Sequence, residues 1–131
     1  MELERLSYSE MIKFKTFGDR LAYLSLWNRS HQSPRSISNS FYHSPAWIAC
    51  RDMILTRDLG SDLGVIGCDI NGLILVHHIN PLIEEDIEEW TDNLFDPDNL
   101  ITVSTNTHNI IHYGPKRDDY VERKPGDTKI W

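Results

Sequence analysis

The feature that most constrains this chain is a short apolar run that ends in two adjacent histidines and is closed by a proline. The run spans residues 73–81 and reads LILVHHINP. Its aliphatic and β-branched residues predict a short buried strand. Successive side chains of a strand point to opposite faces of the sheet, so we expect His77 and His78 to face different surroundings. Such a pair suits a division of labour in which one imidazole binds a metal ion and the other moves a proton.

A second histidine pair has helical spacing. His108 and His112 lie at positions i and i+4, which brings both rings to one face of a helix. We expect this helix over residues 106–113, with Ser104 or Thr105 as its cap and a stop at Gly114.

Together the two pairs suggest a metal site. Three imidazoles from a strand and a helix would suit Zn²⁺, Ni²⁺, Mn²⁺ or Co²⁺ and leave positions open for water or substrate. The fourth imidazole would activate water while the metal stabilises charge on a phosphate oxygen, which predicts phosphodiester hydrolysis. Either pair alone is also compatible with ordinary surface or core histidines. The occurrence of both in order, joined by a turn that contains Asn99, favours the metal site.

Length and composition indicate one soluble domain. The chain has 131 residues, of which 40% are hydrophobic and 25% charged. It has no apolar run long enough for a membrane span and no signal-peptide pattern at its start, so we expect a cytoplasmic protein without membrane contact. Cys50 and Cys68 stand outside any CxxC pair, and we interpret them as small buried residues.

The charge is unevenly distributed. The formal net charge is -7, yet residues 11–57 carry seven Lys/Arg against two acids, and residues 58–100 carry eleven acids with no Lys or Arg. Because a local patch rather than net charge decides phosphate binding, we consider four arginines as nucleic-acid contacts: Arg29, Arg35, Arg51 and Arg57. The first two could equally belong to a solvated linker over residues 27–40, and the other two could be solubilising surface charges.

The remaining pattern predicts the neighbouring elements. Ser9 would cap a first helix that Gly18 and Asp19 break, and Ser44-Pro45 starts a helix to about Arg57. Residues 63–78 read as a hairpin with its turn at 69–72. The acidic run over residues 84–89 is interpreted as a solvated helical turn or loop, and the tail over residues 116–131 would dock back through its last two residues.

The histidine pairs and the turn between them resemble a known motif. The residues HHINP (77–81), FDPDNL (95–100) and THNIIH (107–112) are similar to the HNH nuclease motif, and particularly to its form in DNase colicins. The whole chain resembles small HNH-family proteins encoded by bacteriophages. The resemblance implies an α+β fold with a ββα-metal (His-Me finger) core, N-terminal helices and no zinc ribbon.

The resemblance also implies a role for each residue of the motif. His77, His108 and His112 would bind one divalent metal ion (Zn, Ni, Mn or Mg), His78 would be the general base, and Asn99 would brace the loop that orients the base. Residues 1–40 would form a helical, basic extension, residues 41–114 the nuclease core, and residues 115–131 a tail packed on the core. The chain departs from the colicin pattern at Leu75, where that pattern has an acid.

Three functions remain open from the sequence. The first is a metal-dependent endonuclease that nicks DNA or cleaves it with low specificity. The second is a non-catalytic HNH-fold module that binds a phage packaging protein or a host protein, for which the acidic segment 84–98 is the candidate contact. The third is a structural metal site that only stabilises the fold.

Overall fold

In the computed structural model, residues 5–27, 40–114 and 122–127 are described, and they form a mixed α+β fold. Its helices and strands, in chain order, are α1 (Tyr8–Met11), α2 (Phe17–Leu24), α4 (Pro45–Arg57), β1 (Ile74–His78), α5 (Glu84–Glu89), β2 (Leu100–Ser104) and α6 (Thr105–Tyr113). Three short 3-10 helices accompany them: η1 (Asp62–Gly64), η2 (Asp92–Leu94) and η3 (Pro97–Asn99). The α+β class predicted from the sequence is confirmed. No helix of the described part is long and apolar enough to cross a membrane.

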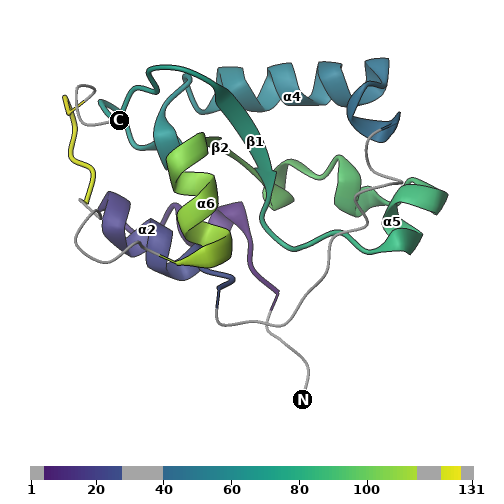
Figure 1. Cartoon of the computed structure of the whole chain (residues 1–131), viewed down its shortest axis with the longest axis horizontal. Helices are drawn as coiled ribbons and strands as arrows, with labels where there is room; N and C mark the ends of the chain where they lie inside the picture. The colour runs from purple at the N-terminus through teal and green to yellow at the C-terminus, as the bar shows by residue number, and fades with distance from the viewer. Residues whose placement is uncertain (1–4, 28–39, 115–121, 128–131) are drawn as a thin grey trace.

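The centre of the fold is a two-stranded antiparallel sheet. β1 pairs with β2 so that His77 lies opposite Ile101 and His78 opposite Leu100. α6 lies against one face of this sheet and α4 against the other, as Figure 1 shows. β2 runs directly into α6, and α6 lies across the two paired strands.

Strand alternation gives the sheet two different cores. The face towards α6 packs with α1 and α2 in a core that includes Ile101, Val103 and Ile111. The opposite face packs against α4 in a second core around Phe41, Trp47 and Leu100. α1 and α2 share the first core with β2 and α6. The division predicted at residue 40 stays a prediction.

Two of the predicted helices begin and end where the sequence signals place them. Ser44 caps α4 by accepting a hydrogen bond from the Trp47 amide, and Pro45 occupies the first turn. Ser104 caps α6 in the same way, accepting from the Thr107 amide at 3.1 Å. Gly114 follows α6 with φ 86°, a conformation that glycine adopts without a Cβ penalty. These boundaries confirm the predictions for both helices.

The predicted hairpin over residues 63–78 is wrong. β1 pairs with the distant β2, whereas the preceding segment contains η1 and a single bridge between Ser61 and Asp69. Leu63 has φ 55° and Gly64 has φ 66°, so the chain turns there and does not run as a strand.

The predicted N-terminal boundaries also need correction. Ser7 caps α1 by accepting from the Glu10 amide, and Thr16 caps α2 by accepting from the Asp19 amide. Gly18 therefore lies inside α2 and does not end a helix. Three predictions fall outside the described residues: the arm with Arg29, the contact of Arg35, and the docking of the last two residues of the tail.

Candidate metal centre

Three histidine side chains converge between β1 and α6. The potential ligand atoms of His77, His108 and His112 all lie within 4.8 Å of one another. The His108 and His112 Nε2 atoms are 3.1 Å apart, and the ring centroid of His77 lies 5.3 Å from that of His108 and 5.1 Å from that of His112. The structure therefore brings together the three residues that the sequence predicts as ligands.

These separations suit a shared metal ion. With metal–nitrogen bonds of about 2.0 Å, two nitrogens of a tetrahedral site lie about 3.3 Å apart, close to the 3.1 Å between His108 and His112. Burial lowers the pKa of His108, which favours the neutral form that a ligand requires. No Asp, Glu or Cys of the described chain belongs to this group. The residues thus fit a divalent ion whose double charge would not be neutralised by the protein.

The local sequence explains why the three rings meet. His77 points to the α6 side because it alternates with His78 along β1. His108 and His112 occupy the same face of α6, one turn apart. His77 is only 4% exposed, whereas the two helical histidines are partly exposed. The group can therefore be approached from the side of α6.

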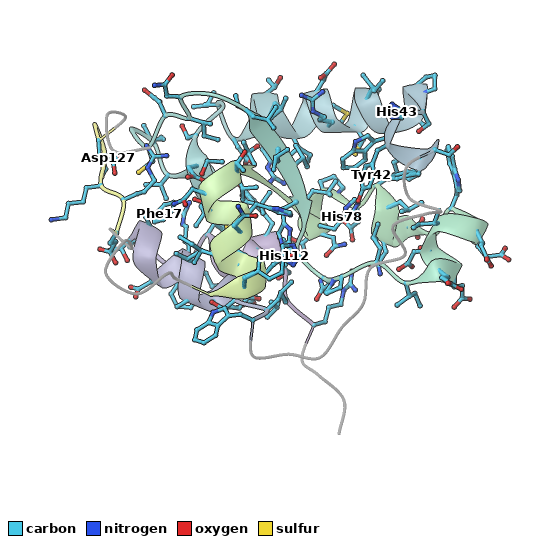
Figure 2. All side chains as sticks on the ribbon, viewed as in Figure 1. Phe17, Tyr42, His43, His78, His112 and Asp127 are labelled. Atoms are coloured by element: carbon cyan, nitrogen blue, oxygen red, sulfur yellow. The ribbon has the colours of Figure 1, made fainter. Side chains whose placement is uncertain are left out.

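His78 lies on the opposite face of the sheet, among aromatic rings. Its ring stacks on Trp47 with centroids 5.0 Å apart and lies near Phe41 and Tyr42 at 6.4 and 6.2 Å. Figure 2 labels His78, Tyr42 and His112, all near the centre of the molecule. Its different surroundings from His77 match the expectation from strand alternation, but its enclosure by these rings was not predicted.

The protonation state of His78 follows from this environment. Burial lowers its pKa from the usual 6.5 to about 4, although the Leu94 carbonyl and Asp86 act in the opposite direction. Its Nε2 lies 3.1 Å from the Leu94 carbonyl oxygen. Because a carbonyl can only accept, neutral His78 carries its proton on Nε2, and Nδ1 keeps the lone pair. The side chain is a neutral, weakly basic imidazole at pH 7.

Asn99 ties together the segments around His78. It is buried, its Oδ1 accepts from the Asn80 backbone and side-chain amides at 2.9 and 2.7 Å, and its Nδ2 donates to the Asn93 carbonyl at 3.0 Å. Asn80 follows the histidine pair, and Asn93 precedes the residue whose carbonyl accepts from His78. The hydrogen bonds are those of a residue that braces the surroundings of His78, while its catalytic importance stays a prediction.

The two described candidate arginines differ. Arg57 donates to the Asp58 carboxylate and to the carbonyls of Pro97 and Leu100, and its guanidinium lies 3.6 Å from the Tyr8 ring centroid. Because these intramolecular contacts engage its guanidinium, Arg57 is a poor candidate for a phosphate contact. Arg51 is partly exposed on α4, the helix on the far side of the sheet from α6, and its contact with nucleic acid stays a prediction.

Sequence reasoning missed two buried carboxylates that hold β2. Asp58 accepts from the Thr102 amide at 2.9 Å, and Asp62 accepts from the Ser104 amide at 3.0 Å. They thereby satisfy amides on the edge of β2 that β1 leaves open, a usual requirement for a buried edge. The spacing of four residues between two acids is the only sequence signal, and it also fits an exposed helix face.

Comparisons with known proteins do not assign the chain to a family. No protein-family model, curated protein or solved structure matches it.

Proposed function

We propose that the chain is a metal-dependent phosphodiesterase of the HNH, ββα-metal type and that it nicks DNA or cleaves it with low specificity. One observation carries the proposal: a strand and the helix across it contribute three imidazoles, His77, His108 and His112, whose ligand atoms lie within 4.8 Å of one another. The order of strand, strand and helix agrees with the motif that the sequence resembles.

The charge of such a centre favours an anionic substrate. Three neutral ligands would leave a divalent ion with its full charge, and phosphodiesters are the abundant biological anions that such a centre can polarise. When bound, the ion would stabilise charge on a phosphate oxygen and on the leaving alkoxide. The partial exposure of His108 and His112 leaves room for that substrate on the α6 side.

His78 is the candidate general base in this proposal. Its Nε2 donates to the Leu94 carbonyl, so Nδ1 is the nitrogen that would take a proton from water. His78 lies at the end of β1 on the face opposite the histidine group, so proton transfer from water at the metal centre requires a path around the strand end and an opening of the cluster formed by Trp47, Phe41 and Tyr42. Asn99 would hold the segments on both sides of the base.

Cleavage of supercoiled plasmid tests the proposal. The wild-type chain is incubated with Mg²⁺, Mn²⁺, Ni²⁺ or Zn²⁺ beside His112→Ala, His78→Ala and the exposed control Asn109→Ala on the same helix. We expect nicking by the wild type and the control, loss with His112→Ala, and a fall of about 100-fold or more with His78→Ala. If the folded, metal-loaded wild-type chain cuts DNA with none of the four ions, the proposed nuclease activity is refuted.

The burial of His78 favours one alternative. An imidazole that is 7% exposed and stacked on Trp47 is also what a structural core histidine looks like. In that case the chain is a non-catalytic HNH-fold module, its metal stabilises the fold, and it acts by binding a partner protein. This alternative predicts that the chain binds metal without cleaving DNA. It also predicts that His78→Ala lowers the stability of the fold and has no other effect.

A further inference from the structure

We propose that Arg123 positions the metal-binding helix through a buried ion pair with Asp62, so that the segment 122–127 sets the metal affinity of the histidine group. This inference rests on the metal centre of the proposed function. It adds a residue that lies outside the histidine group and outside the motif, and it makes the C-terminal segment part of the site.

The ion pair between Arg123 and Asp62 is fully buried. The side chains of Arg123 and Asp62 are both 0% exposed, with Nη1 of the arginine 3.1 Å from Oδ2 of the aspartate. Arg123 also donates from Nε and Nη2 to the Asp127 carboxylate at 3.1 and 2.7 Å, and from Nη2 to the Asp69 carbonyl at 2.9 Å. A guanidinium held in this planar network fixes the position of the carboxylate that it faces.

Asp62 also holds the start of α6. The same Oδ2 atom accepts from the Thr107 hydroxyl at 2.6 Å and from the Ser104 hydroxyl at 2.9 Å, and Oδ1 accepts from the Ser104 amide at 3.0 Å. Ser104 is the cap of α6, and Thr107 directly precedes the ligand His108. Asp62 therefore holds the junction at which β2 becomes α6, and a carboxylate at this end of a helix also interacts favourably with its dipole.

The geometry of the histidine group depends on this junction. One ligand, His77, is on β1, whereas His108 and His112 are on α6, so the angle between strand and helix decides whether the three nitrogens meet. Outer partners that orient ligands commonly change metal affinity by about 10- to 100-fold when they are removed. Without Arg123, the buried Asp62 carboxylate would lose its cationic partner, and its bonds to the junction would rearrange.

The test is Co²⁺ binding by the full chain, followed through the visible absorption of the ion, with the fold of each variant checked by circular dichroism. Arg123→Met should weaken Co²⁺ binding by about 10-fold or more. The control Lys124→Met, an exposed neighbour that keeps the segment, should stay within about twofold. Arg123→Lys should recover part of the affinity because it restores the charge without the planar fork. A merely stabilising role would lower the resistance to urea and leave the Co²⁺ affinity of the folded chain unchanged.

A second variant keeps the test decisive if Arg123→Met does not fold. Thr107→Val removes one hydroxyl bond to Asp62 while it keeps the side-chain shape, and we expect a smaller loss of Co²⁺ affinity in the same direction. Unchanged affinity in a folded Arg123→Met, or in Thr107→Val where the former does not fold, would overturn the inference. A wild-type chain that binds no Co²⁺, Zn²⁺ or Ni²⁺ would instead remove the metal centre itself, so the two failures are distinguishable.

Discussion

The buried, neutral His78 makes stability depend on pH in a calculable way. The unfolded chain binds a proton at this residue below about pH 6.5, whereas the folded chain does so only below about pH 4. Between these values the unfolded state binds more protons, so the free energy of unfolding falls as the pH falls. Linkage with these two pKa values gives a loss of about 2 kcal/mol between pH 7 and pH 5. No comparable change from this residue is expected between pH 7 and pH 8.

Urea unfolding of the metal-free chain in the presence of a chelator measures this effect. The other histidines titrate as well, so the informative quantity is the difference in pH dependence between the wild type and His78→Phe, which keeps a ring against Trp47. The lost hydrogen bond to Leu94 lowers the stability of the variant equally at every pH. We expect the wild type to lose about 2 kcal/mol more than the variant between pH 7 and pH 5. Parallel pH curves for the two proteins would refute the burial of a neutral imidazole at position 78.

Three further predictions follow from particular contacts. Thr102 Oγ1 is buried and has no hydrogen-bond partner in the described part of the chain. Thr102→Val should therefore be neutral or should raise the free energy of unfolding in urea by about 1 kcal/mol, and a loss above about 1 kcal/mol would contradict this. Gly67 has φ +94°, and a Cβ there would lie 2.7 Å from the Pro125 Cβ, whereas Gly60 has φ +65° and open space around it. Gly67→Ala should therefore lower the urea midpoint more than Gly60→Ala does, and equal midpoints would speak against the contact. Zn²⁺ at 100 times its Kd should stabilise the wild type by about 2.7 kcal/mol and His112→Ala by much less, measured by urea unfolding; equal stabilisation would place the ion elsewhere.

The elements of the histidine group could be predicted because their signals are local. Ser44-Pro45 marks the start of α4. Ser104 marks the start of α6, and Gly114 marks its end. The i, i+4 spacing and strand alternation are properties of the backbone alone, so they place His108 and His112 together and separate His77 from His78. These regularities place the two helical rings together and separate His77 from His78, whereas the approach of His77 to α6 also requires the pairing of β1 with β2.

The pairing of the strands could not be predicted, because it depends on distant residues. An Asn-Gly dipeptide before β1 favours a local hairpin, yet the edge of β2 is held by Asp58 and Asp62, and β1 completes the other edge. Two buried carboxylates look like surface acids in the sequence, since aspartate is seldom buried without a partner.

The surroundings of the site depend on contacts that sequence spacing does not reveal. Arg123 reaches Asp62 across 61 residues, and its type and position in a polar tail give no sign of burial. The enclosure of His78 likewise requires Phe41 and Trp47 to fold over the sheet from the segment that begins α4. Strand alternation determines which face a side chain takes, and only tertiary packing determines what covers it.

The central claim is that His77, His108 and His112 bind one divalent ion together, and zinc K-edge X-ray absorption tests it most directly. The spectrum of the chain with one equivalent of Zn²⁺ should contain three imidazole ligands at about 2.0 Å with oxygen completing the shell, and His112→Ala should retain two. Fewer than three imidazoles in the wild type, or a sulfur ligand from Cys50 or Cys68, would contradict the proposed centre.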